Sequence, residues 1–127
     1  MSPAITITIS SSLRFASQVR ILVDILERKG IRVLYPHLET AQQENFELDV
    51  KRALVFDFFP KIDVCDILYI FDQEGYIGLS VAAEIGYAHA QKKRIIAKEA
   101  PKDMGIRSLI PEIFDVPDFL ALIEKKK

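Results

Sequence analysis

Several common features are scarce in this sequence, and each scarcity excludes a class of protein. There is a single cysteine, Cys65, which cannot form an internal disulfide and indicates a reducing compartment. No run of roughly eighteen or more apolar residues occurs, so no segment is predicted to cross a bilayer. The N-terminus also lacks the basic region and apolar core of a signal peptide. Together these absences predict a cytoplasmic protein.

An excess of charge of either sign is missing as well. Lys and Arg number 17 and Asp and Glu 18, for a formal net charge of −1, and no run of like charges is longer than Lys125–Lys127. This balance argues against a protein that binds nucleic-acid polymers or membrane surfaces through charge. With 127 residues, of which 50% are hydrophobic and 28% charged, the chain is expected to form one domain over residues 1–127.

What the sequence does contain is an alternation of strand-like and helix-like segments. Short β-branched or continuous apolar runs indicate strands, and apolar residues at helical spacing indicate helices. This alternation predicts a Rossmann-like or flavodoxin-like α/β domain, a parallel sheet of about four to five strands with helices on both faces. Strands are expected at Ala4–Ser10, Ile31–Tyr35, Asp66–Phe71 and Arg94–Ala97, and helices at Phe15–Arg28, Leu48–Phe59 (ended by Pro60), Ser80–Gln91, near Ile106–Phe114 and at Val116–Glu124.

Three segments of the chain follow predicted strands and should meet at one edge of the sheet. They are Ser10–Phe15, His37–Phe46 and Asp72–Glu84. In open parallel sheets, ligands bind outside the carboxyl ends of the strands, near the switch in strand order. We therefore expect the functional site among these three segments.

The segment Gly75–Ala90 (GYIGLSVAAEIGYAHA) places one carboxylate, Glu84, among small, apolar and aromatic residues. Glu84 is either a solvated side chain that favours a helix N-terminus or a nucleophile in a small pocket. The dipole of the first helical turn is expected to keep this carboxylate ionised. Its predicted position at the functional edge favours the nucleophile.

Two further stretches offer binding groups. The run Ser10, Ser11, Ser12, Leu13, Arg14 joins a strand to a helix, and it is either a plain serine N-cap or a cradle for a phosphate or sugar hydroxyl. The glycines of Gly75–Gly78 do not form a GxGxxG fingerprint, and the chain has no P-loop. These glycines are expected to permit a tight turn and the close approach of a ligand.

Three other residues near this edge, one acidic and two aromatic, each have two interpretations. Asp72 caps a turn or contacts a ligand, and Tyr76 and Tyr87 stack on a base or pack against the protein. His37 and His89 have no Cys or His partner at ligand spacing, so no metal site is expected.

The stretch KIDVCDILYIFD, followed by GYIGLSVAAEIGYA, resembles the nucleoside 2-deoxyribosyltransferase family and its relative, 2'-deoxynucleoside 5'-phosphate N-hydrolase. The likeness spans most of the chain and is strongest over Lys61–Ala90. It implies a small doubly wound α/β fold in which Glu84 attacks C1' of a deoxyribonucleoside, with no cofactor. Ser12-Leu13-Arg14 resembles the S-I-R loop that holds the substrate 5'-phosphate, and Ser80 lies near the helix-start serine of the hydrolase.

The chain departs from this family at two positions. Phe58 occupies the place of a catalytic aspartate, with Asp57 beside it, and Gly78 replaces a second aspartate. An acid must still protonate the leaving base, and Asp72 and Asp57 are the candidates. The predicted function is cleavage or transfer at the N-glycosidic bond of a nucleoside or nucleoside 5'-monophosphate. The alternative is a non-catalytic nucleotide-binding module that kept the pocket and lost these acids.

A homo-oligomer, most simply a two-fold dimer, is also expected. Relatives in the family complete their sites with a neighbouring subunit, as the resemblance implies. Independently, Leu48–Phe59 carries apolar residues on more than one helical face, whereas a helix packed on one sheet buries a single stripe. Either Phe56 and Phe59 fold under the preceding loop, His37–Glu47, or a second copy of the chain covers them near the Glu84 pocket.

Overall fold

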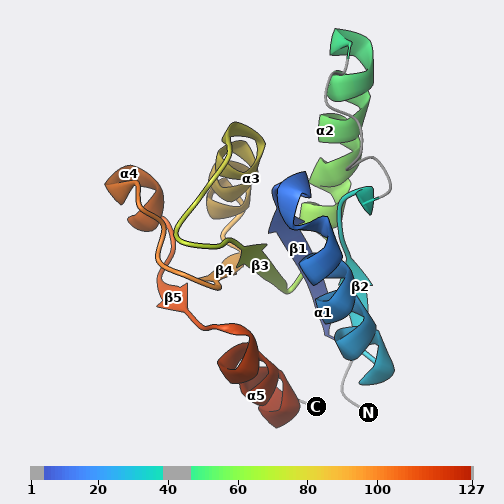
Figure 1. Cartoon of the computed structure of the whole chain (residues 1–127), viewed down its shortest axis with the longest axis vertical. Helices are drawn as coiled ribbons and strands as arrows, with labels where there is room; N and C mark the ends of the chain where they lie inside the picture. Colours follow the sequence, from blue (N-terminus) through green and yellow to red (C-terminus); the bar gives the residue numbers. More distant parts are fainter. Residues whose placement is uncertain (1–4, 39–46, 127) are drawn as a thin grey trace.

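A five-stranded parallel sheet organises the computed structural model, which describes residues 5–38 and 47–126 (Figure 1). The strand order is β2-β1-β3-β4-β5, which is the flavodoxin-like arrangement and confirms the predicted fold class. Every neighbouring pair of strands is parallel. The strands are β1 (Thr6–Ser11), β2 (Arg32–Leu34), β3 (Ile67–Phe71), β4 (Arg94–Ala97) and β5 (Glu112–Ile113).

Helices cover both faces of this sheet, as the alternating pattern predicts. The short 3-10 turn η1 (Leu13–Phe15) leads into α1 (Ala16–Arg28), which shares one face with α5 (Val116–Lys126). The opposite face carries α2 (Leu48–Asp63) and α3 (Leu79–Ala90), with α4 (Met104–Arg107) at its edge. Each face therefore has its own hydrophobic cluster, with the sheet between them.

Alternation along β1 sorts its side chains between these two clusters. Ile7 and Ile9 pack in the cluster under α1 and α5, so Thr8 and Ser10 point to the face that α2 and α3 cover. All five residues of β3 are buried because this central strand is covered on both faces. The sheet thus brings a serine, Ser10, beneath the helix that carries Glu84.

Two expectations about element boundaries are wrong. Helix α2 does not end before Pro60 but continues through it to Asp63. The exposed proline loses one backbone hydrogen bond, while Phe58 and Ile62 are buried against the sheet and hold the last turns in place. The segment near Ile106–Phe114 is also not one helical patch, because α4 ends at Arg107 and residues 112–113 pair with β4 as the edge strand.

The first half of α2 packs against little of the described chain. Figure 1 shows this helix extending past the other elements at one end of the molecule. Leu48 is 70% exposed and Phe56 is 59% exposed, whereas burial begins with Phe58. The alternative that Phe56 and Phe59 fold under the loop expected over His37–Glu47 falls largely on residues 39–46, which lie outside the described residues.

Candidate functional site

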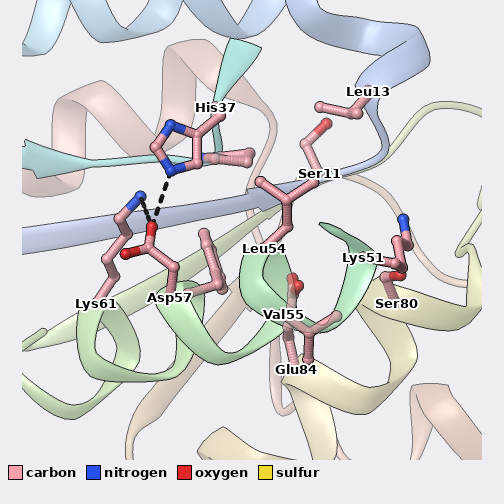
Figure 2. A pocket seen from close by; sticks show the side chains of 12 residues that line it. Ser11, Leu13, His37, Lys51, Leu54, Val55, Asp57, Lys61, Ser80 and Glu84 are labelled. Atoms are coloured by element: carbon pink, nitrogen blue, oxygen red, sulfur yellow. Dashed lines mark hydrogen bonds and ion pairs between the residues drawn. The ribbon is translucent and has the colours of Figure 1, made fainter. Parts of the chain in front are cut away.

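A cleft opens at the carboxyl ends of β1 and β2, between α2 and the start of α3 (Figure 2). Its empty volume is about 520 Å³, including space open to solvent. Its apolar lining comes mostly from α2, and its polar groups come from four segments: the end of β1, the chain after β2, α2 itself and α3. The lining residues are Ser11, Leu13, Pro36, His37, Lys51, Leu54, Val55, Asp57, Phe58, Lys61, Ser80 and Glu84.

Glu84 reaches this cleft because of its place in α3. Val81, Ile85 and Ala88 form the buried stripe of the helix, and Glu84 follows Val81 by three residues. At helical spacing these side chains share one face, so the Glu84 carboxylate is directed toward the sheet. There Ser10, fully buried at the end of β1, donates a hydrogen bond of 2.5 Å from Oγ to Glu84 Oε1.

Burial raises the pKa of Glu84 from its ordinary value of 4.5 to about 7. Loss of hydration disfavours the carboxylate, and the Ser10 hydrogen bond and the positive charge of Lys51 offset this only in part. The expectation that the helix N-terminus keeps Glu84 ionised is therefore wrong. Glu84 lies beyond the first turn of α3, where the helix dipole no longer acts strongly, so burial dominates.

A second polar cluster lies on another side of the cleft. His37 Nε2, just after β2, is 2.9 Å from Asp57 Oδ2 on α2. Lys61, one turn along the same helix, approaches that oxygen at 3.4 Å and donates a hydrogen bond of 3.0 Å to the carbonyl of Tyr35. The His37 hydrogen bond, followed by the positive charge of Lys61, lowers the pKa of Asp57 below its ordinary value. The Asp57 carboxyl group is thus held in its ionised form.

Of the residues predicted from the sequence, the structure brings Glu84, Asp57, Ser11 and Ser80 together in the cleft. Ser10 contacts Glu84 rather than the open space, because its side chain is fully buried.

The rest of the serine loop lies beside the cleft. Ser12 caps η1, and its Oγ accepts a hydrogen bond of 3.4 Å from the backbone N–H of Arg14. The Arg14 guanidinium lies 4.0 Å from the centroid of the Tyr76 ring, over its face, so neither of these two residues lines the cleft.

Asp72 does not line this cleft. It is buried at the end of β3, where its Oδ1 accepts a hydrogen bond of 2.9 Å from the backbone N–H of Glu99. Its Oδ2 has no hydrogen-bond partner among the described residues, and burial raises the pKa of Asp72 to about 6. The observed contact is structural, since it ties the end of β3 to the chain after β4.

Three other predicted binding residues also make contacts within the protein. Gly75 has a φ of 76°, and a Cβ there would lie 2.7 Å from the carbonyl oxygen of Ala100, so the turn requires glycine. Gly78 is the N-cap residue of α3. Tyr87 stacks on Phe59 with ring centroids 4.4 Å apart, and this contact packs α3 against α2.

Three basic residues of the cleft were not among the site residues predicted from the sequence: His37, Lys51 and Lys61. His37 was weighed only as a metal ligand, although it opens the segment after the second strand, which was expected at the functional edge. The spacing of Asp57 and Lys61, four residues apart on a predicted helix, was the available signal for an ion pair. No cluster of three metal-binding side chains occurs in the part of the chain that the structure describes.

The fold and the site together define a class: a flavodoxin-like α/β domain with a partly buried carboxyl group at the carboxyl edge of its sheet. No protein-family model matches the sequence, and no curated protein matches it either. Within the described ranges, no helix is long and apolar enough to cross a membrane.

Solved structures share this architecture over nearly the whole chain. A conserved protein from Enterococcus faecalis V583 matches with a TM-score of 0.70 at 15% identity, covering 98% of this chain and 100% of that one. A 2-deoxyribosyltransferase from Bacillus psychrosaccharolyticus matches with a TM-score of 0.65 at 16% identity, covering 90% and 89%. The CMP N-glycosidase BcmB from Clostridium botulinum matches with a TM-score of 0.59 at 20% identity, covering 96% and 99%.

At these identities the likeness shows the fold. Two of the three structures are named as enzymes, a 2-deoxyribosyltransferase and a CMP N-glycosidase.

Proposed function

We propose that this chain is an enzyme that cleaves or transfers at the N-glycosidic bond of a nucleoside or nucleoside 5'-monophosphate, with Glu84 as the nucleophile. The observation that carries the proposal is the Glu84 carboxyl group, partly buried at a cleft on the carboxyl edge of the sheet and held by Ser10 at 2.5 Å. The deoxyribosyltransferase and the CMP N-glycosidase that share the fold support the choice of substrate class.

The chemistry follows from the carboxylate. Glu84 in its ionised form attacks C1' of the sugar, a C–O bond forms, and the C1'–N bond breaks with its electron pair passing to the base. The base takes up a proton as it leaves. Water then releases the sugar from Glu84 in a hydrolysis, whereas a second base attacks C1' in a transfer. Because burial raises the pKa of Glu84 to about 7, activity should increase as pH rises through neutrality.

The groups around Glu84 suggest how the sugar is oriented. Ser11 from the β1 loop, Ser80 from the start of α3 and Lys51 from α2 line the same cleft. Hydroxyls and a cation are suited to bind sugar oxygens or a 5'-phosphate. We place the 5' end of the substrate toward these residues, with Ser12 and Arg14 of the adjoining loop available to a phosphate.

Incubation with a panel of deoxynucleosides, nucleosides and their 5'-monophosphates, with chromatography for free base, tests the proposal. The wild-type protein is expected to release base from at least one member, and Glu84→Gln is expected to release none while still binding it. Asp24→Asn, which neutralises an exposed carboxylate on α1, is the matched control and should keep full activity. Equal turnover by wild type and Glu84→Gln would refute the role of Glu84.

One observation favours the non-catalytic alternative. Phe58 lines the cleft at the place where the resembling family has an aspartate, and Asp72 lies outside the cleft. A nucleotide-binding module would bind members of the panel in calorimetry but release no base from any of them. The two measurements on one protein sample therefore separate the enzyme from the binding module.

A further inference from the structure

Among the described residues, the carboxyl groups that line the cleft are those of Glu84 and Asp57, and neither is suited to give a proton to the departing base. Asp72 is outside the cleft, and Asp57 is paired with His37 and Lys61, which keep it ionised. Glu84 itself must be ionised to act as the nucleophile. A neutral purine or pyrimidine is a poor leaving group unless it is protonated, so another donor is needed.

We propose that His37 is the general acid for this reaction and that Asp57 is a positioning residue that orients the imidazole and stabilises its protonated form. This inference rests on the proposed function and deepens it. The general acid is then neither Asp72 nor Asp57, the two aspartates expected from the sequence, and the His37–Asp57 pair has a role in the reaction.

The geometry supports this division of roles. His37 follows β2 and Asp57 lies on α2, and their side chains meet with Nε2 and Oδ2 2.9 Å apart. Figure 2 shows His37, Asp57 and Lys61 gathered on one side of the cleft and Lys51 with Ser80 on the other. With the 5' end of the sugar toward Ser80 and C1' at Glu84, the base extends toward the His37 side.

The proton-transfer step balances with these groups. The imidazolium of His37 gives the proton on Nδ1 to a ring nitrogen of the base while Nε2 stays on Asp57. The C1'–N bond breaks at the same time, and its electron pair stays on the base. The neutral imidazole that remains then takes a proton from the water, or from the second base, that attacks C1'. Imidazole is suited to both steps because its charge ordinarily changes between about pH 5 and 8.

Lys61 is a less suitable donor, although it lines the same side of the cleft. Its ammonium group is already engaged by the carbonyl of Tyr35 and by Asp57. An ammonium group also ordinarily holds its proton well above neutral pH. Lys61 instead holds Asp57 in place beneath the histidine.

The charges around His37 come from several elements. Asp57, Lys61 and Lys51 on α2 and Glu84 on α3 line the cleft with it, and Glu27 on α1 lines a hollow on another side. Because several charges act on His37, the leaving group of the substrate is the variable that tests its role.

The test compares two leaving groups on the same sugar. One substrate is the member of the panel that is cleaved fastest, and the other carries 4-nitrophenolate in place of the base, which leaves without a proton. His37→Gln should lower kcat/KM for the first roughly 10²–10⁴-fold, the usual contribution of general acid catalysis, and change the second less than about threefold. Asp57→Asn should give a smaller loss with the same selectivity.

The controls separate this inference from the proposed function. His89→Gln removes the other histidine, which is exposed on α3, and should leave both rates unchanged. Glu84→Gln should abolish both rates. Equal losses for the two substrates, or no loss, in His37→Gln would overturn the role of His37 while the proposed function stands. A wild-type protein that releases neither leaving group would overturn the proposed function and the role of His37 with it.

Discussion

Replacing Glu84 with glutamine should make the protein more stable at neutral and alkaline pH, in addition to removing its chemistry. The folded protein holds this carboxyl group with a pKa of about 7, against an ordinary value of 4.5. Above pH 7 the folded chain must therefore keep an ionised carboxylate in a poorly hydrated position. Glutamine has nearly the same shape and can accept the Ser10 hydrogen bond, but it carries no charge.

The sign and size of the effect follow from linkage. A group whose pKa is raised by folding contributes stability below its unfolded pKa, and that contribution is lost as pH rises through the folded pKa. For Glu84 the window runs from about pH 4.5 to about pH 7. At about 1.4 kcal/mol per pKa unit, the full loss is roughly 3 kcal/mol, and most of it falls between about pH 5 and 8.

Urea unfolding of both proteins at pH 5 and pH 8, followed by far-ultraviolet circular dichroism, measures this loss. Glu84→Gln should gain roughly 2–3 kcal/mol in free energy of unfolding relative to wild type when the pH rises from 5 to 8. The pKa of Asp72 is also raised, to about 6, but Asp72 is present in both proteins and cancels in the difference. A difference between the two proteins that does not change with pH would refute the reasoning, because Glu84 would then titrate alike in the folded and unfolded chains.

The remaining predictions concern the backbone, the serine loop and assembly. Gly75→Ala should lower the free energy of unfolding, measured in urea, by more than about 1 kcal/mol, because Gly75 has a positive φ and its added Cβ would lie 2.7 Å from the carbonyl oxygen of Ala100. Gly86→Ala is the control and should not be destabilising, because its added Cβ would have nothing within 4 Å. Arg14→Ala should weaken binding of a 5'-monophosphate by roughly 1.5–3 kcal/mol in calorimetry and leave the unphosphorylated nucleoside unchanged; equal losses would mean that Arg14 is structural. Light scattering at micromolar concentration should show a homodimer, and Phe56→Lys on the exposed half of α2 should weaken it; a wild-type mass of one chain would refute the assembly.

The order of strands and helices was readable from the sequence because local patterns encode it. Local patterns placed β4 and the body of α1 nearly where they lie, and the continuous apolar run of Asp66–Phe71 predicted the strand β3. Local pattern failed at Pro60, where burial of Phe58 and Ile62 outweighs one lost hydrogen bond. It also failed for β5, a strand of two residues that exists only because β4 offers it a partner.

The position of Glu84 was likewise available from the sequence. Ligands bind at the carboxyl edge of a parallel sheet, and Glu84 is the lone acidic residue in an apolar helical segment that begins there. These two signals together indicated Glu84 and the segments around it. The partners of Glu84 were not available, because they come from distant parts of the chain. Ser10 and Glu84 are 74 residues apart, and only the packing of α3 on the sheet joins them.

Tertiary structure alone decided which acidic residues belong to the cleft and in what state. Asp72 was the first candidate from the sequence and Asp57 the second, but Asp72 turns to the backbone of Glu99 and Asp57 meets His37. The physical reason is that a carboxyl group's ionisation depends on its burial and on the charges within a few ångströms, which the chain brings together only on folding. The sequence by itself determined the fold and the position of Glu84 at the carboxyl edge of the sheet. The packing of the helices decided which side chains surround Glu84.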